Sequence, residues 1–323
     1  MNTRSRRGLA AWALGLVLAG WALVAPAKAP VCPPVARPPA LAELQAAQAK
    51  ARDHGLLWRI SKDGRHAYLY GTLHVGKLDW ALPGPMLRQA LSETQVLALE
   101  LDVTDARTQQ QLQAMTVRRA DAPALPEALQ RRLDKAGSEA CLPPGMLQDR
   151  QPVFRVMTLV LLAARWEGLD PAFGLEAMLS GWARQRRVPI VALETVQSQL
   201  GALMPGSEAD ERHMVDQGLA QLESGAARRA VRRLGQAWAA GHLQELAAYE
   251  QWCDCVADAR DRELMQRIND GRNPGLADAI EELHGRGQTV FAAVGALHMT
   301  GEQALPKLLA QRGFQVERVS FER

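Results

Sequence analysis

The sequence predicts an α/β protein with a central mixed or parallel sheet, built from two related halves and a large helical insertion. Apolar runs that suit strands alternate with helical stretches near both ends of the chain. One pattern, a strand-forming run leading into Gly-x-Leu-His, occurs at 71–74 and again at 295–298. An Ala-, Leu-, Arg- and Glu-rich stretch, about 208–283, indicates helices inserted before the second copy.

The first half is expected to contain a hairpin, a helix and a buried strand. Strands at 57–61 and 66–70 are separated by Lys62-Asp63-Gly64, which suits a tight turn. A helix over 83–93 follows, and the Val- and Leu-rich run 96–103 predicts a strand buried on both faces.

Apolar spacing gives the remaining elements. We expect helices at 153–166 and from Leu175 to Trp182, a strand at 188–193, helices within 208–283 broken near Gly225, Gly241 and Gly271, and a closing strand, helix and strand at 289–294, 303–312 and 315–321.

Residues 1–29 have the features of an export signal. Three arginines precede an apolar run, and Ala27-Lys28-Ala29 resembles a cleavage site. The run is nearly long enough to span a bilayer, so an uncleaved membrane anchor is the alternative. We expect a Pro-rich stalk and short helix at 30–53, then one α/β domain at 54–323, located in the periplasm or tethered to the membrane facing it.

Charge argues against a nucleic-acid partner. The formal net charge is +3, but residues 1–29 carry four basic residues and no acidic ones. The rest of the chain has 34 Lys and Arg against 35 Asp and Glu, without the basic excess that nucleic acids require.

The four cysteines Cys32, Cys141, Cys253 and Cys255 permit three disulfide pairings. Cys253 and Cys255 are so close in sequence that an easy mutual bridge is not expected. We therefore expect one of them to pair with Cys141. A zinc site is disfavoured because no Cys-x-x-Cys or flanking His accompanies them.

The residues that could carry chemistry lie near the ends of predicted strands. His74 and His298 end the two repeated patterns, and Glu100 lies late in the 96–103 strand, after an apolar run in which an unpartnered charge would be costly. Imidazole and carboxylate at neighbouring strand ends suit a divalent metal. Glu194 could hydrogen-bond to a ligand His or cap the next helix.

Other familiar site patterns are missing from the sequence. It has no Gly-x-Ser-x-Gly, no His-Glu-x-x-His and no Gly-x-Gly-x-x-Gly. We interpret the remaining histidines as surface or turn residues: His54, His66, His213, His242 and His284.

Several motifs in their order resemble the TraB/GumN family, which includes the Tiki-type metalloproteases. The likeness covers roughly Leu57 to Val319 and is carried by 68–76, Leu82-Pro83, 97–102, 188–195, Gln199-Leu200, Arg272-Asn273 and 291–301. It implies a scaffold related to the erythromycin-esterase and ChaN-like proteins. It also implies metal binding and catalysis by His74, His298 and Glu100, with Arg272 as a supporting cation.

The function predicted from these observations is an exported, metal-dependent hydrolase, most simply a peptidase acting on peptides or proteins. A divalent Mn, Co or Zn ion would be held by His74, His298 and Glu100, with Glu100 as ligand or general base. Arg272 would stabilise an oxyanion or hold Glu100 in place. The alternatives are a non-catalytic periplasmic protein that binds a metal, haem or peptide, and a regulatory module with a vestigial pocket.

Overall fold

The computed structural model describes residues 31–321, of which all but Val31 belong to one compact unit. It confirms the α/β class, with a six-stranded mixed sheet in the order β4-β3-β5-β2-β1-β6. The strands are β1 (Leu56–Lys62), β2 (Arg65–Thr72), β3 (Val96–Leu99), β4 (Ile190–Ala192), β5 (Val290–Gly295) and β6 (Gln315–Val319).

The strands that precede the two Gly-x-Leu-His loops are neighbours. β2 and β5 run parallel, with Thr72 opposite Gly295. On the far side of β5, β3 is also parallel and places Leu99 opposite Ala293. β4 continues the parallel set beyond β3. Four strand ends therefore meet at one edge of the sheet, where open α/β sheets bind ligands.

The expected hairpin at the start of the domain is confirmed. β1 pairs antiparallel with β2, with Leu57 opposite Tyr70. Asp63 and Gly64 in the turn have φ values of 53° and 73°, the left-handed pair that matches strand twist in two-residue hairpins. On its other edge β1 pairs antiparallel with β6, so the last strand lies beside the first.

The expected helical breaks near Gly225, Gly241 and Gly271 are also confirmed. The α-helices are α1 (Leu41–Ala49), α2 (Pro85–Ser92), α3 (Ala106–Thr116), α4 (Glu127–Glu139), α5 (Pro152–Leu162), α6 (Leu175–Arg186), α7 (Val196–Leu203), α8 (Glu208–Glu223), α9 (Ala226–Ala239), α10 (Leu243–Ala247), α11 (Tyr249–Trp252), α12 (Ala259–Ile268), α13 (Asn273–Gly285) and α14 (Leu305–Gln311). Short 3₁₀ segments are η1 (Ala163–Glu167), η2 (Pro171–Phe173) and η3 (Ala296–Met299).

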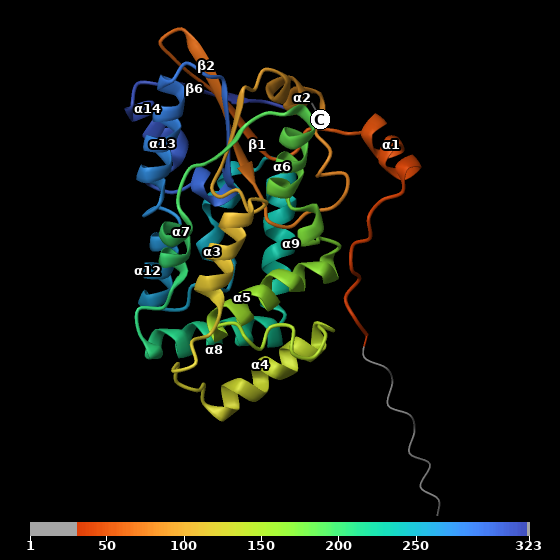
Figure 1. Ribbon diagram of the computed structural model, residues 1–323, viewed down its shortest axis with the longest axis vertical. Coiled ribbons are helices and arrows are strands. Elements are labelled where there is room, and N and C mark those ends of the chain that lie inside the picture. The colour runs from red at the N-terminus through yellow and green to blue at the C-terminus, as the bar shows by residue number, and fades with distance from the viewer. Residues whose placement is uncertain (1–30, 322–323) are drawn as a thin grey trace, which may run out of the picture. The chain divides into compact units, whose positions relative to one another are not determined.

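The sheet lies between two sets of helices. In Figure 1, α13 and α14 lie on one side of it and α2 and α6 on the other. All of them contribute to one core with fully buried strand residues such as Leu97 and Phe291. A second core joins α4, α5 and α8, which lie at the bottom of the view, through Leu133, Val156 and Leu219. The helical part is thus broader than 208–283, because α3 to α7 precede it.

The expected strand at 96–103 ends early, at Leu99. The next residue, Glu100, is buried and turns its carboxylate toward the backbone of Gly295 instead of continuing the ladder. The strands expected at 188–193 and 315–321 are likewise shortened, to β4 and β6.

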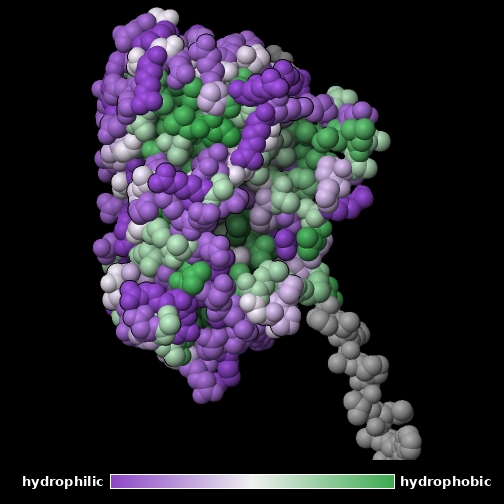
Figure 2. All heavy atoms as spheres, viewed as in Figure 1, coloured by the Kyte–Doolittle hydropathy of each residue, from purple (hydrophilic) through white to green (hydrophobic). Residues whose placement is uncertain are grey.

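Most of the segment before the domain is exposed, although Pro33 is buried and Cys32 is bonded to Cys141. No residue of α1 is buried, and Val35 and Leu41 are 65% and 71% exposed. The green surface on the right of Figure 2 lies where Figure 1 places α1. Among residues 31–321, no helix is long and apolar enough to cross a membrane. The proposed signal or anchor at 1–29 lies outside the described residues.

The expected disulfide pairing is wrong. Cys141 pairs with Cys32, and Cys253 pairs with Cys255. The single residue between the last two, Asp254, has a φ of 53°. This left-handed turn brings the two Cα atoms to 5.1 Å, a separation that a disulfide spans readily.

Candidate active site

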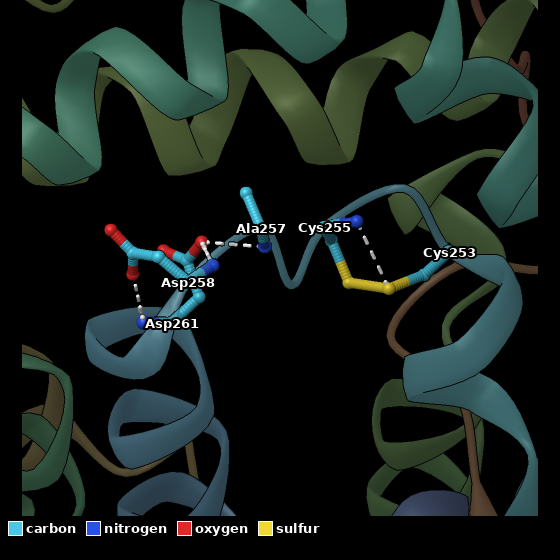
Figure 3. Close-up of a disulfide and its surroundings, with 5 residues drawn as sticks. All are labelled: Cys253, Cys255, Ala257, Asp258 and Asp261. Carbon is cyan, nitrogen blue, oxygen red and sulfur yellow. Dashed lines mark hydrogen bonds between the residues drawn. A yellow bond between two sulfur atoms is a disulfide. The ribbon is translucent and has the colours of Figure 1, made fainter.

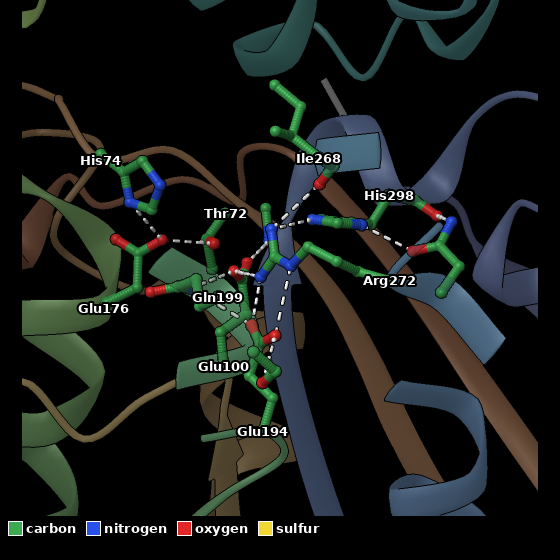
Figure 4. Close-up of polar contacts among 12 residues, drawn as sticks. Thr72, His74, Glu100, Glu176, Glu194, Gln199, Ile268, Arg272 and His298 are labelled. Carbon is green, nitrogen blue, oxygen red and sulfur yellow. Dashed lines mark hydrogen bonds and ion pairs between the residues drawn. The ribbon is translucent and has the colours of Figure 1, made fainter. Parts of the chain in front are cut away.

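Each of four neighbouring parallel strands delivers one charged or imidazole side chain to the same edge. In spatial order, β4 leads to Glu194, β3 to Glu100, β5 to His298 and β2 to His74. The sequence prediction that His74, His298 and Glu100 share a region of the fold is thus matched by the topology. Figure 4 shows Glu100, Glu194 and His298 around the guanidinium of Arg272, with His74 beside them next to Glu176.

Arg272 connects three of these side chains. Its Nη2 pairs with Glu100 Oε2 at 2.5 Å and with Glu194 Oε1. Its Nε donates to Glu194 Oε2 at 3.2 Å. Its Nη1 donates to the Ile268 carbonyl and to His298 Nε2, both at 3.1 Å. All five N–H bonds of the guanidinium therefore have an acceptor within the protein.

Glu100 is held at both carboxylate oxygens. Oε1 accepts the backbone N–H of Gly295 at 2.6 Å, and Oε2 accepts Gln199 Nε2 at 2.9 Å as well as Arg272. Burial opposes its ionisation, but the positive charges of Arg272, His74 and, below about pH 4, protonated His298 outweigh burial together with this N–H and lower the pKa of Glu100 to about 2. The repeated Gly leaves room for this contact, since a Cβ on Gly295 would lie only 3.3 Å from Oε1.

His298 is buried and neutral. Nδ1 lies 2.6 Å from Asn273 Oδ1, while Nε2 faces Arg272, which can only donate. These partners assign the proton to Nδ1 and the lone pair to Nε2. Burial, with Arg272 adding to it, lowers the pKa of His298 to about 4.

His74 forms a second pair with Glu176, a residue that the sequence reasoning missed. His74 Nδ1 lies 3.2 Å from Glu176 Oε1, which also accepts Thr72 Oγ1 at 2.6 Å. The side chain of Glu176 is 17% exposed, whereas that of His74 is 65% exposed. The charge of Glu176 and the hydrogen bond to it raise the pKa of His74 to about 9. The pair is therefore anchored on one side and open to solvent on the other.

Backbone contacts explain how Glu176 reaches His74. The loop after β2 pairs with the segment before α6, through Gly76 N–H to the Asp170 carbonyl at 3.1 Å and the reverse bond at 2.7 Å. Leu175 N–H then donates to the Leu73 carbonyl at 3.1 Å. Glu176 follows in the first turn of α6, where the helix dipole favours a carboxylate. The only indication of Glu176 in the sequence was its position as an acidic residue beside the apolar stripe at 175–182.

Glu194 neither hydrogen-bonds to a histidine nor caps α7, the two roles that the sequence suggested for it. The N-cap of α7 is Thr195, whose side chain pairs reciprocally with Ser198 in a capping box. The Glu194 carboxylate binds Arg272 instead. Burial raises its pKa, although Arg272 opposes that shift.

Two of the histidines interpreted as surface or turn residues, His213 and His284, have side chains that are largely buried. The prediction that His284 lies at the surface is wrong. It is 2% exposed and hydrogen-bonds through Nε2 to the Lys62 carbonyl at 3.1 Å. His213 lies 2.9 Å from Asp261 and, with Asp258, forms a set of three possible ligand atoms within 4.8 Å of one another. Both carboxylates already cap α12 or the turn before it.

That set is the only group of three such ligand residues found between residues 31 and 321. His74, His298 and Glu100 share one region but their ligand atoms are not drawn into a set this tight. The contacts explain why, because His298 Nε2 and Glu100 Oε2 both face the guanidinium of Arg272.

Fold and site together define an α/β protein whose candidate active site is assembled from histidines, carboxylates and one arginine beyond four parallel strands. The chain belongs to the TraB/PrgY/gumN family, whose model matches residues 56–318. It is 26% identical over 266 residues to the "Uncharacterized protein YbaP" of Shigella flexneri and to that of Escherichia coli (strain K12). Each match covers 76% of this chain and 88% of the relative. No solved structure matches it significantly.

Proposed function

We propose that the chain is a metal-dependent hydrolase that cleaves peptide bonds. The observation that carries the proposal is the pair of His74 and Glu176 at the open side of the site. Their potential metal-ligand atoms, His74 Nδ1 and Glu176 Oε1, lie 3.2 Å apart. An imidazole next to a carboxylate, with room beside them for water and substrate, is the donor chemistry of catalytic metal sites.

The charge of the cluster supports a cation there. Three carboxylates, those of Glu100, Glu176 and Glu194, are accompanied by Arg272 and by a single titrating imidazole, His74. With Glu194 ionised, negative charge is thus in excess whether or not His74 is protonated. A divalent ion would offset this excess when His74 releases its proton.

The ligand set predicted from the sequence fits such an ion only in part. His74 is exposed and its partner Glu176 is a carboxylate, so both suit it. His298 and Glu100 direct their lone pairs at the guanidinium of Arg272, and a cation between them would compete with it. We therefore assign the metal to His74 and Glu176, with His298, Glu100 and Arg272 as supporting residues.

In this assignment a bound divalent ion would acidify a water molecule and polarise the scissile carbonyl. Glu176 fixes the orientation of His74 and is itself fixed by Thr72. Arg272, with no N–H left for a substrate, positions Glu100, Glu194 and His298. Glu100, with a pKa of about 2, stays ionised and is a weak general base.

The test is the metal content of the full chain after incubation with manganese, cobalt or zinc. We expect stoichiometric metal in the wild type and in His298→Gln, and its loss in His74→Ala and Glu176→Gln. Far-UV circular dichroism of each variant controls for misfolding. Loss in His298→Gln alone would return the site to His298 and Glu100, and no metal in any protein would overturn the proposal.

A quenched-peptide library then separates enzyme from binding protein. Cleavage by the metal-loaded wild type and not by Glu176→Gln supports the peptidase. Stoichiometric metal with no cleavage of any peptide favours the non-catalytic binding protein instead.

We also propose that the protein acts outside the cytoplasm. All four cysteines are paired, and disulfides form and persist mainly in oxidising compartments. Cell fractionation followed by alkylation of the chain tests this, since recovery in the cytoplasmic fraction with free thiols would contradict it.

A further inference from the structure

The Cys253–Cys255 disulfide has no evident role as a structural staple. It closes a loop with one intervening residue, whereas Cys32–Cys141 spans 109 positions. A disulfide stabilises a fold largely by restricting the unfolded chain, and this effect grows with the length of the closed loop. The short bridge therefore adds little stability of this kind.

The residue between the two cysteines, Asp254, has a φ of 53°, in the left-handed region. Asp adopts this region more readily than most residues, and Cys141 in the long bridge has the same φ. Backbone conformation therefore does not separate the two bridges, and the difference between them rests on the length of the closed loop.

The surroundings favour attack at one of the two sulfurs. Cys253 is 2% exposed, whereas Cys255 is half-buried and follows the exposed Asp254. The backbone N–H of Cys255 lies 3.1 Å from Cys253 Sγ, as Figure 3 shows. This N–H would stabilise negative charge on Cys253 if Cys255 were attacked.

Acidic neighbours oppose a thiolate here, but each has a partner. Asp254 lies 3.5 Å from Arg229. Asp258 and Asp261 form the capping box of α12 in Figure 3, and Asp261 also binds His213. Each of these carboxylates thus has a hydrogen-bond or ion-pair partner within the fold.

We propose that Cys253–Cys255 is a thiol–disulfide exchange site for external thiols, while Cys32–Cys141 stays oxidised. An external thiolate attacks Cys255 Sγ, a mixed disulfide forms, and the electron pair of the broken S–S bond leaves on Cys253, which takes up a proton. A second external thiol attacks the donor sulfur of the mixed disulfide. This step releases Cys255 as a thiol and the donor as a disulfide.

The test equilibrates the full chain in glutathione buffers of graded composition, traps free thiols by alkylation and assigns them by peptide mass spectrometry. We expect Cys253 and Cys255 to be alkylated under conditions about 100-fold less reducing than those that open Cys32–Cys141. Opening of both disulfides together, or of Cys32–Cys141 first, would overturn the proposal. So would loss of the circular dichroism spectrum when only the short bridge is open.

A matched pair of variants tests the role of backbone strain. Asp254→Val puts a β-branched residue at the left-handed position and should make the bridge about tenfold easier to reduce. Asp254→Asn, which tolerates that conformation, should leave it unchanged. Equal reduction potentials in the two variants would show that the backbone conformation at position 254 does not affect how easily the bridge is reduced.

A peptide that carries two cysteines identifies the kind of thiol donor. Its oxidation by the chain, abolished in the Cys253→Ser/Cys255→Ser double variant, would indicate a protein dithiol. Equilibration with glutathione alone would indicate a small thiol. Exchange with neither would overturn the proposal.

Discussion

Arg272 donates through Nη1 to Nε2 of His298 at 3.1 Å, so the nitrogen that could bind a metal or a proton already has a partner. On the other side of the ring, Nδ1 donates to Asn273 at 2.6 Å. Arg272 and Asn273 are adjacent in sequence at the start of α13. One short segment therefore fixes the tautomer, orientation and charge of His298.

Asn273→Asp should raise the pKa of His298 from about 4 by about 1–2 units. A carboxylate at this position would stabilise the imidazolium, which the neutral amide does not. NMR titration of the His298 ring protons measures the change. Asn273→Ala is the control and should leave the pKa depressed, because burial and Arg272 remain. An unchanged pKa in Asn273→Asp would contradict the assigned hydrogen bond.

Arg272→Met should destabilise the fold by about 3–5 kcal/mol at pH 7. The substitution keeps much of the side-chain volume but leaves Glu100 and Glu194 buried without their cation. The loss should be smaller near pH 4, where the carboxylates can take up protons. Urea unfolding at the two pH values measures both effects.

The control for Arg272 is an exposed ion pair. Arg119 and Asp121 are paired with side chains 79% and 70% exposed. Arg119→Met should therefore leave stability almost unchanged. Equal losses in the two variants would mean that burial of the Arg272 cluster is not what makes it important.

The site residues that follow strands could be predicted because each is marked by a local sequence pattern. Gly-x-Leu-His occurs twice after a strand-forming run, and parallel pairing of β2 with β5 follows from ordinary α/β topology. Glu100 was identifiable since a charge after an apolar run needs a partner. The positions of His74, His298 and Glu100 at one edge could therefore be predicted.

What could not be predicted depends on contacts between distant segments. Glu176 reaches His74 only because the loop at Gly76 pairs with Asp170, and no sequence pattern encodes that pairing. Gln199 reaches Glu100 from α7 across 99 positions. The Cys253–Cys255 bridge depends on the left-handed backbone conformation of Asp254. That conformation is uncommon, so the short spacing of the two cysteines argued against a bond between them.

Glu100 should make stability depend on acid pH. Its pKa is about 2 in the folded chain and 4.5 ordinarily, so its contribution is present above about pH 4.5 and is lost as pH falls toward 2. Glu100→Gln should therefore destabilise the fold at pH 7, and the difference from wild type should shrink between pH 4.5 and 2. Urea unfolding across this range measures it. A difference independent of pH would indicate lost packing instead of lost charge.

Glu176→Gln should return the pKa of His74 from about 9 toward the ordinary 6.5, measured by NMR titration in a chelator so that protons alone compete for the ring. The sign follows from the pair: a raised pKa in the folded chain means that the stabilising interaction is complete below pH 6.5 and is lost as pH rises through 9. Because the His74 side chain is 65% exposed, solvent screens the pair and the effect on stability should be small. Thr72→Val, which removes the hydroxyl that holds Glu176 but keeps its charge, should lower the pKa less than Glu176→Gln does. If Glu176→Gln left the pKa near 9, another group would have to hold His74 charged, and the pairing on which the proposed metal site rests would be wrong.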